Sequence, residues 1–536
     1  LAMVKNNHGT VIDIESIPLE DPKAFRVLQT AQTTGVFQLE SSGMKRYLKD
    51  LKPTHIEDII AMVALYRPGP MELIPDYIAR KHGRKQVEYL HPALEPILRN
   101  TYGVMVYQEQ LLAAVRALAG FSLAEADILR KAVGKKIKSL LDEQEGKFIE
   151  GAKRVGTPDA IAKKFWGLVE PFNRYAFNRS HAACYAMLAY QTAYLKANWP
   201  SEFMAAFLNS ETGDVERVAF LVDEARTMGI QVLPPHINES FERFAVVQAA
   251  STPTLRFGLS AIKNVGGTVV HAIIEERKAH GAFKSIDDLV TRVVHKDMNK
   301  KSLESLAKCG ALDDLGERNA IIAGIDQLLA HARQTAKQQA MGQDSLFGDA
   351  LGGPMKFSLP SIAPMPKADK LKWEKELIGL YVSAHPMSDY TARLQLEKVT
   401  PIKSLRPLPG MQVKVAGIVV ASKKIITKTG KPMMFCTIED ATAKIEIVVF
   451  PSAMEKTQHA WADNTIVVIS GKLDSRDGTP KILCDEAEPL AIIGSHRPSA
   501  PHPLLPLILD GQITRRVASR SCRHLWQPAS TRPCDA

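Results

Sequence analysis

The spacing of apolar residues changes along the chain, and this change most strongly limits the possible folds. From residue 1 to about 230, apolar residues recur every three or four positions. This period predicts amphipathic helices, whereas residues 412–490 alternate in the period-two pattern of strands. The clearest expected helices cover residues 56–65, 109–118, 124–133 and 181–198, and the clearest expected strands cover residues 413–419, 444–450 and 465–471. A fold with a single type of secondary structure is therefore excluded.

The length and these patterns predict a multidomain α+β protein. A chain of 536 residues exceeds what one hydrophobic core organises. A helical region at 1–230 is expected to lead into a hairpin-like helical module at 231–330, with a strand at 255–259 and a helix at 268–278. Residues 331–405 follow as a connecting region, in which the Gln-, Ala-, Gly- and Pro-rich part from about 331 to 366 is expected to be a linker. A small barrel is expected at 406–492, and an irregular, disordered tail at 493–536.

Charge and composition narrow the classes of partner. The formal net charge of +10 favours a polyanion, since neutralising phosphates releases counterions. The six cysteines lie far apart, without a Cys-x-x-Cys pair or a zinc-ligand pattern, which indicates reduced thiols. Apolar runs are much shorter than the ~20 residues that span a bilayer. We therefore expect a cytoplasmic protein with no membrane partner and no metal held by this chain.

One group of cations follows the expected helix at 124–133. Arg130 and Lys131 should project from its last turns, and Gly134 is expected to end the helix. Lys135 and Lys136 would then lie in an exposed turn beside them. The alternative is that these cations only complement the helix dipole, an effect of about 0.3 to 1 kcal/mol.

A second group lies just before the expected helix at 181–198. Asn178, Arg179, Ser180 and His181 combine cations with hydrogen-bonding side chains. Asn or Ser can cap the helix, and the same helix start can hold a phosphate through its free amides. His181 is interpreted as a hydrogen-bonding residue and not as a catalytic base.

Further segments carry a family resemblance. Residues 34–45, 64–70 and 107–110, in this order and followed by the elements at 130–136 and 178–181, resemble the fingers of the alpha subunits of bacterial DNA polymerase III. These are family C replicative DNA polymerases. The resemblance runs from about residue 10 to about residue 490.

The resemblance implies a nucleotidyltransferase whose fingers close over an incoming deoxynucleoside triphosphate and the template. Arg130 and Lys131 would meet the triphosphate, where the family commonly has two arginines. Lysine keeps the charge but loses the bidentate fork. Lys135, Lys136 and residues 178–181 would line the same surface.

The family also needs three palm aspartates, two of them in an Asp-x-Asp motif, to hold Mg²⁺. This sequence contains no Asp-x-Asp triplet, and the pair Asp13 and Glu15 matches the connection into the fingers. The catalytic palm is therefore expected before Leu1, with Mg²⁺ required by the intact polymerase. No catalytic residue is predicted in this chain, which should be inactive alone.

The module at 231–330 resembles the family's helix-hairpin-helix element. Its candidate DNA-binding residues are Lys263, Asn264, Gly266 and Gly267. Glycines let a backbone approach a phosphate, and a helix start supplies amide donors. The alternative is an ordinary tight helix connection. Residues 298–312 are expected to supply a second helical unit, whose alternative role is simple packing.

The linker and the barrel add two candidate contacts. Gln343, Leu346 and Phe347, within the sequence QDSLF, match the peptide by which bacterial replication proteins bind the sliding clamp, the beta subunit. The β-rich segment resembles the family's OB domain. It carries candidate single-strand-binding residues, namely Lys423, Lys424, Lys428, Lys431 and Phe435. The alternative there is a solvated lysine-rich loop over a core phenylalanine.

The leading hypothesis is a part of a DNA-directed DNA polymerase that acts in DNA replication. Its expected partners are primer-template and single-stranded DNA, the deoxynucleoside triphosphate, the sliding clamp and other DNA polymerase III holoenzyme subunits. A non-catalytic nucleic-acid-binding scaffold and an error-prone family C relative remain as alternatives. A tRNA synthetase is disfavoured, since no adenylate-forming signature is found.

Overall fold

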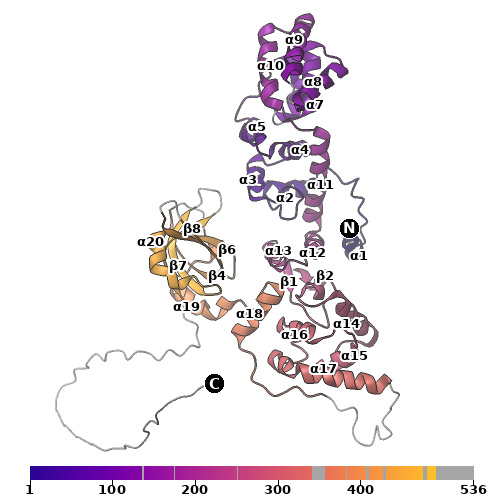
Figure 1. Cartoon of the computed structure of the whole chain (residues 1–536), viewed down its shortest axis with the longest axis vertical. Helices are drawn as coiled ribbons and strands as arrows, with labels where there is room; N and C mark the ends of the chain where they lie inside the picture. Colours follow the sequence, from indigo (N-terminus) through magenta and orange to yellow (C-terminus); the bar gives the residue numbers. More distant parts are fainter. Residues whose placement is uncertain are drawn as a thin grey trace, which may run out of the picture.

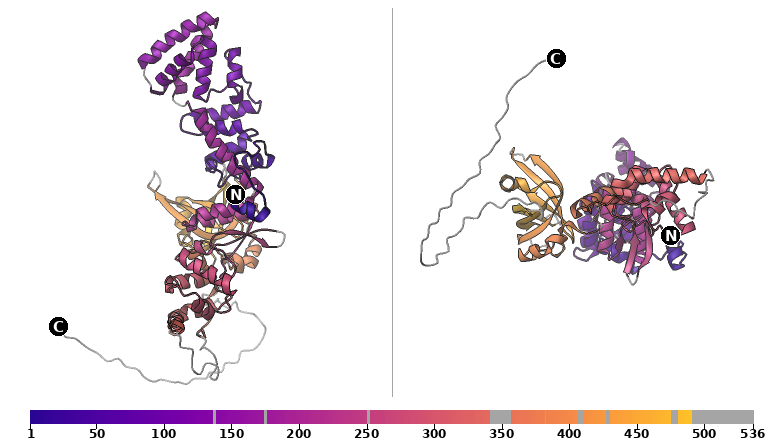
Figure 2. Two further views of the ribbon diagram at one scale, coloured as in Figure 1. Left: turned by 90° about the vertical axis from the view of Figure 1, so that its right-hand side faces the viewer. Right: turned by 90° about the horizontal axis from the view of Figure 1, so that it is seen from below.

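The computed structural model describes residues 1–135, 138–173, 176–249, 252–340, 357–381, 383–405, 410–426, 430–474 and 480–490. The described chain is elongated, with a helical half at one end and a second helical module at the other (Figure 1). A β-barrel stands beside this column of helices rather than within it (Figure 2).

The first half is helical, as predicted. The expected helix at 56–65 coincides with α4, and the other three expected helices differ from the observed ones by no more than two residues at either end. The elements are α1 (Ala2–His8), α2 (Pro22–Gln29), α3 (Ser42–Leu51), α4 (Ile56–Leu65), η1 (Pro70–Leu73), α5 (Ile74–Lys81), η2 (Pro92–Leu94), α6 (Glu95–Leu98), η3 (Arg99–Thr101), α7 (Gln108–Ala119), α8 (Leu123–Lys135), α9 (Lys138–Val155), α10 (Asp159–Asn173) and α11 (Arg179–Asn198).

These helices bury two separate apolar cores. One core is formed by α2 to α5 together with α11, and the other by α6 to α10. Small residues allow the long helix α11 to pack closely against α2 and α4, because Ala182, Ala186, Ala189 and Ala193 are fully buried on one face. The second core centres on Phe148, whose ring lies 5.7 Å from that of Phe165. Two helical lobes therefore meet near the start of α11.

The middle of the chain forms a third core with a small sheet. Its elements are α12 (Pro200–Ser210), α13 (Val215–Thr227), β1 (Gln231–Leu233), β2 (Ala245–Ala249), β3 (Thr252–Arg256), η4 (Leu259–Ala261), α14 (Gly267–His280), α15 (Ile286–Arg292), α16 (Lys300–Lys308) and α17 (Arg318–Ala340). The sheet has the order β1-β3-β2, with β1 parallel and β2 antiparallel to β3.

The strand predicted at 255–259 is wrong at its end. β3 stops at Arg256, and a 3₁₀ turn begins at Leu259. Gly258 keeps an extended backbone, with φ −78° and ψ 140°, and packs tightly against the chain at Arg243, where an added Cβ would lie 2.5 Å from the Arg243 carbonyl carbon. The turn begins after this glycine, at Leu259. The second helical unit predicted at 298–312 contains α16.

The predicted linker from residue 331 is wrong at both ends. α17 continues to Ala340, because its Gln- and Ala-rich sequence has high helix propensity. Residues 357–366 then return along α17. A Cβ at Gly324 would lie 3.0 Å from Pro360, and the Met365 amide donates to Glu317 Oε1 at 3.0 Å. The candidate clamp-binding residues Gln343, Leu346 and Phe347 lie outside the described residues, as does the predicted tail.

The predicted OB-type barrel is confirmed as a closed barrel. The connecting elements are α18 (Lys367–Ile378), η5 (Pro386–Tyr390), α19 (Thr391–Leu396) and η6 (Ile402–Ser404). The barrel elements are β4 (Gln412–Ile426), β5 (Pro432–Glu439), β6 (Lys444–Val449), α20 (Pro451–Thr457), η7 (Gln458–Ala460), β7 (Ile466–Asp474) and β8 (Lys481–Pro489). The strands close in the order β4-β5-β6-β8-β7, with β6 and β8 parallel. Lys444 Nζ lies 3.0 Å from Asp223 Oδ2, which ties the barrel to α13.

Within the part of the chain that the structure describes, no helix is both long and apolar enough to cross a membrane. The described cysteines, Cys184, Cys309, Cys436 and Cys484, are free thiols.

Candidate nucleic-acid interface

The α8 cations share one carboxylate. Arg130 Nε donates to Asp127 Oδ1 at 2.9 Å, and Lys131 Nζ lies 2.8 Å from Asp127 Oδ2. The hydrogen bonds from Lys131 and Arg130 hold the pKa of the Asp127 carboxyl below its usual value. Asp127 therefore orders both cations at the helix surface, through the i,i+3 and i,i+4 spacing.

The predicted helix end at Gly134 is wrong. α8 continues through Gly134 to Lys135, because a glycine in the last turn is tolerated when the flanking residues favour helix. Lys136 and the side chain of Lys135 lie outside what the structure describes.

The start of α11 is capped by two side chains. Asn178 Oδ1 accepts from the His181 amide at 2.8 Å, so the N-cap is Asn178, and of the two candidate caps, Asn or Ser, it is the asparagine that caps the helix. Glu109, at the start of α7, accepts from Asn178 Nδ2 at 2.9 Å and from the Arg179 amide at 3.0 Å. Two amides that an anion would use are therefore already bonded to side-chain oxygens.

The Arg179 side chain turns toward α4 and α7. Its Nη2 donates to Glu57 Oε1 at 2.5 Å, and its guanidinium carbon lies 5.9 Å from the centre of the Tyr107 ring. Ser180 and His181 are exposed. The interface thus presents one cation held by a carboxylate and two side chains open to solvent.

An aromatic row runs along the exposed face of α11. The His181 ring lies 5.4 Å from Phe177 and 4.4 Å from Tyr185, and Tyr185 lies 5.5 Å from Phe37. Arg67 closes one end, with its guanidinium carbon 4.3 Å from the Phe177 ring centre. Neighbouring aromatic rings beside an arginine are a surface on which bases can stack.

A short backbone pairing fixes this arrangement. The Gln108 amide donates to the Phe177 carbonyl at 2.9 Å, and the Phe177 amide donates to the Val106 carbonyl at 3.2 Å. The two segments therefore enter α7 and α11 side by side. Among the described residues, no hydrogen bond or ion pair joins the α8 cations to the α11 start.

The hairpin before α14 is open to solvent. Lys263, Asn264, Gly266 and Gly267 are all exposed, as a DNA contact requires. Gly266 is the N-cap with φ −75° and ψ 151°, and no side chain caps this helix. A Cβ at Gly266 would meet only Thr268 Oγ1, at 3.8 Å. The glycines are therefore not needed by neighbouring protein atoms, and they leave room for another molecule.

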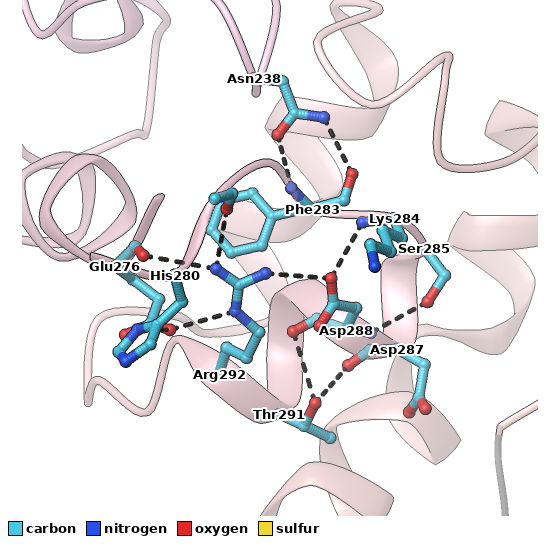
Figure 3. Close-up of polar contacts among 11 residues, drawn as sticks. Asn238, Glu276, His280, Phe283, Lys284, Ser285, Asp287, Asp288, Thr291 and Arg292 are labelled. Carbon is cyan, nitrogen blue, oxygen red and sulfur yellow. Dashed lines mark hydrogen bonds and ion pairs between the residues drawn. The ribbon is translucent and has the colours of Figure 1, made fainter. Parts of the chain in front are cut away.

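An arginine fixes the elbow between α14 and α15 (Figure 3). Arg292 Nε donates to Glu276 Oε1 at 3.0 Å, Nη1 to Asp288 Oδ2 at 3.1 Å, and Nη2 to the Gly281 carbonyl at 2.9 Å. Its guanidinium carbon also lies 4.5 Å from the Phe283 ring centre. These contacts hold α14 in a fixed direction, and therefore hold the hairpin at its start.

The barrel offers a mixed aromatic and basic surface. Lys423 on β4 is paired directly with Phe435 on β5, so both side chains lie on the same face. Phe435 is half-buried and lies between the fully buried Met434 and Cys436, which point into the barrel. The interpretation of Phe435 as a core residue is therefore wrong. Lys424 and Lys431 are exposed, and Lys428 lies outside the described residues.

Comparisons with known proteins match three regions of the chain. Residues 1–156 match the family described as bacterial DNA polymerase III alpha subunit finger domain. Residues 229–321 match the helix-hairpin-helix motif, and residues 413–490 match the OB-fold nucleic acid binding domain. DNA polymerase III subunit alpha of Saccharopolyspora erythraea is 40% identical over 514 residues, covering 92% of this chain and 42% of the relative.

The chain belongs to the family of bacterial DNA polymerase III alpha subunits. The alpha subunit of Thermus aquaticus is 43% identical over 84% of this chain and 37% of the relative. That of Escherichia coli K12 is 39% identical over 87% of this chain and 41% of the relative. The chain thus spans less than half the length of these curated relatives.

The described residues do not form a metal centre. No group of three or more His, Cys, Asp or Glu side chains within the described ranges is placed to hold a metal ion. Asp13 and Glu15 are joined only by a local contact, in which the Glu15 amide donates to Asp13 Oδ1 at 3.2 Å. A two-metal polymerase site does not fit these residues, so no chemical step is assigned to a metal on this chain.

Sequence reasoning missed the residues that surround the α11 start. Glu57, Glu109 and Arg67 lie far from residue 178 in sequence, and Tyr185 and Phe37 read as ordinary helix and turn residues. A signal was present for Phe37, Arg67 and Glu109, because segments 34–45, 64–70 and 107–110 carried the family resemblance. The contacts themselves depend on tertiary structure.

Proposed function

We propose that this chain is the part of a replicative DNA-directed DNA polymerase that contacts the primer-template and the incoming deoxynucleoside triphosphate. The observation that carries the proposal is the α11 start, where an aromatic row ends with Arg67 over the Phe177 ring and Arg179 follows Phe177 by two residues. Bases can stack on the row while phosphates meet the cations.

In this proposal the triphosphate is bound by Arg130 and Lys131, with residues 178–181 along the same surface. The hairpin of α14 binds a DNA backbone phosphate, because its first-turn amides face solvent at two exposed glycines. The face of the barrel that carries Lys423 and Phe435 binds the single-stranded template.

The remaining partners follow from the same assignment. Gln343, Leu346 and Phe347 bind the sliding clamp, and other holoenzyme subunits bind the intact protein, which acts in the cytoplasm. Mg²⁺ serves the intact polymerase. The chain alone does not extend a primer, since neither its sequence nor its described residues supply the paired carboxylates that the reaction needs.

A salt titration of the chain against fluorescent primed DNA tests the DNA-contacting role. Affinity should fall as salt rises, with a log-log slope that grows by about 0.7 to 0.9 for each neutralised phosphate. Phe435→Ala should weaken single-strand binding by about 1 to 3 kcal/mol, the usual contribution of one stacked base. An affinity that is independent of salt would rule out the proposed contacts.

The clamp contact has its own test. Burying Leu346 and Phe347 contributes about 1.5 to 3 kcal/mol each. Replacing both with alanine should therefore weaken binding of the purified clamp by ~100-fold or more, since each ~1.4 kcal/mol is tenfold. DNA binding without the clamp serves as the control and should not change. Equal clamp affinities for the two chains would refute this assignment.

A further inference from the structure

Two carboxylates occupy the groups with which the α11 start would bind an anion. Glu109 bonds Asn178 Nδ2 and the Arg179 amide, at 2.9 and 3.0 Å. Glu57 bonds the Arg179 guanidinium at 2.5 Å. Arg179 therefore has a carboxylate on its side chain and another on its backbone.

Two buried polar atoms in this cluster have no hydrogen-bond partner. They are Glu57 Oε2 and the hydroxyl of Tyr107. Tyr107 is 1% exposed, and its ring lies beside the Arg179 guanidinium. Burial, followed by the charge of Glu57, raises the pKa of Tyr107, so its hydroxyl remains a protonated donor. Buried polar groups in folded proteins usually have a hydrogen-bond partner, so these two atoms are available to bond to a group that enters the site.

We propose that the carboxylates of Glu57 and Glu109 occupy the positions that phosphate groups would take, and that a nucleoside triphosphate displaces Glu57 from Arg179 when it binds. The hydroxyl of Tyr107 is the donor that remains for the Glu57 carboxylate after this exchange. The inference rests on the proposed nucleotide-binding function of the fingers. It makes Glu57 and Glu109 positioning residues, because they act through Arg179 and the α11 start.

The exposure of the ion pair makes an exchange feasible. The side chains of Arg179 and Glu57 are 43% and 29% exposed. Ion pairs open to water contribute little to stability, because solvent screens them. A triphosphate carries several negative charges and accepts the planar fork of arginine in a bidentate geometry. It can therefore replace a single carboxylate at a partly exposed guanidinium.

The test uses charge-removing variants of the same shape. Glu57→Gln and Glu109→Gln keep a hydrogen-bond acceptor but remove the competing charge. Glu143→Gln is the matched control, because Glu143 is an exposed acid on α9 that pairs with Lys147 at 2.7 Å. Inorganic triphosphate, titrated by calorimetry into the full chain without metal, is the probe.

Each variant should bind triphosphate roughly two- to fivefold more tightly than wild type, and the double variant about tenfold more tightly. The control should match wild type. The log-log salt dependence should also become steeper, because counterions then replace the internal carboxylates on the cations. In an Arg179→Ala background, Glu57→Gln should no longer change the affinity, since the two residues act as one unit.

Three outcomes overturn the inference. If the variants bind triphosphate as wild type does, the carboxylates do not compete and the proposed function stands. If Glu57→Gln lowers only the melting temperature, the ion pair merely joins α4 to α11. If neither wild type nor any variant binds triphosphate, the nucleotide-binding function fails together with the inference.

Discussion

Two helix starts on this chain are candidates for binding phosphate, and they are built differently. The start of α11 carries an Asn178 cap and a Glu109 carboxylate on its amides. The start of α14 has glycine at the N-cap and no side-chain cap. Acids also lie near α14, since Thr268 Oγ1 donates to Asp297 Oδ2 at 2.5 Å, but within the described residues none accepts from its first-turn amides.

The two helix starts would therefore bind an anion in two different ways. At α14 the amides face solvent, so a DNA phosphate displaces only water and the glycines let the backbone approach. This suits continuous, sequence-independent contact with DNA. At α11 a ligand must compete with internal groups, which suits a site that should respond only to a highly charged ligand. In the α14 module, the Glu276 carboxylate accepts a hydrogen bond from Arg292. This contact lies at the other end of the helix, away from the first-turn amides.

The largest expected effect comes from giving α14 the kind of cap that α11 has. Gly266→Asp fits the space and the backbone angles, because a Cβ there meets only Thr268 Oγ1 at 3.8 Å. The aspartate should cap the first-turn amides and repel phosphate, so affinity for primed DNA should fall about tenfold, on the order of 1.4 kcal/mol. Fluorescence anisotropy measures the affinity.

Gly266→Asn is the control for charge, because it copies the Asn178 cap without adding a carboxylate. Its loss of DNA affinity should be only about two- to threefold, since a neutral cap competes for the amides but does not repel the phosphate. Wild-type affinity in the Gly266→Asp chain would mean that the two helix starts do not differ in function.

A smaller effect is expected from removing the cap of α11. Asn178→Ala removes the bond to the His181 amide, which should destabilise the helix start by about 0.5 to 2 kcal/mol. Gly266→Ala at α14 should destabilise its helix start less than Asn178→Ala does, because it removes no side-chain hydrogen bond and glycine ranks below asparagine at the N-cap. Hydrogen exchange of the first-turn amides of both helices makes the comparison in one experiment. Equal changes at the two starts would contradict the distinction.

The sequence predicted the positions of the helices better than the side-chain contacts at the helix starts. The apolar period placed α4 and nearly all of α11, and the cap of α11 was narrowed to Asn or Ser because this signal is local. The ion pair of Glu57 with Arg179 joins residues 122 positions apart, and the bond of Glu109 to the Arg179 amide spans 70 positions. No local pattern encodes such pairs. The return of residues 357–366 along α17 was missed for the same reason, since its contacts, such as Pro360 with Gly324 and Met365 with Glu317, join positions far apart in the sequence.

The smallest expected effect concerns the pH dependence of the α14–α15 elbow, which supports the open helix start. The hydrogen bond from Arg292 is the largest cause that lowers the pKa of Glu276. Burial acts in the opposite direction, and His280 adds to the lowering. A carboxyl with a lowered folded-state pKa contributes stability above its unfolded pKa. That stability is lost as pH falls through the folded-state pKa.

Wild type should therefore melt at a slightly higher temperature than Glu276→Gln at neutral pH, and the gap should close below about pH 4, near the ordinary pKa of a glutamate. This difference in melting temperature should be small, because the carboxylate is at the surface and Arg292 keeps its bond to the Gly281 carbonyl at 2.9 Å.

In an Arg292→Lys background the difference in melting temperature should be smaller, since lysine lacks the planar fork that reaches several acceptors at once. Thermal unfolding at a series of pH values measures all three chains. A gap that stays constant with pH would show that the Glu276 carboxylate does not support the elbow, and that the direction of α14 depends instead on the backbone contacts of Arg292.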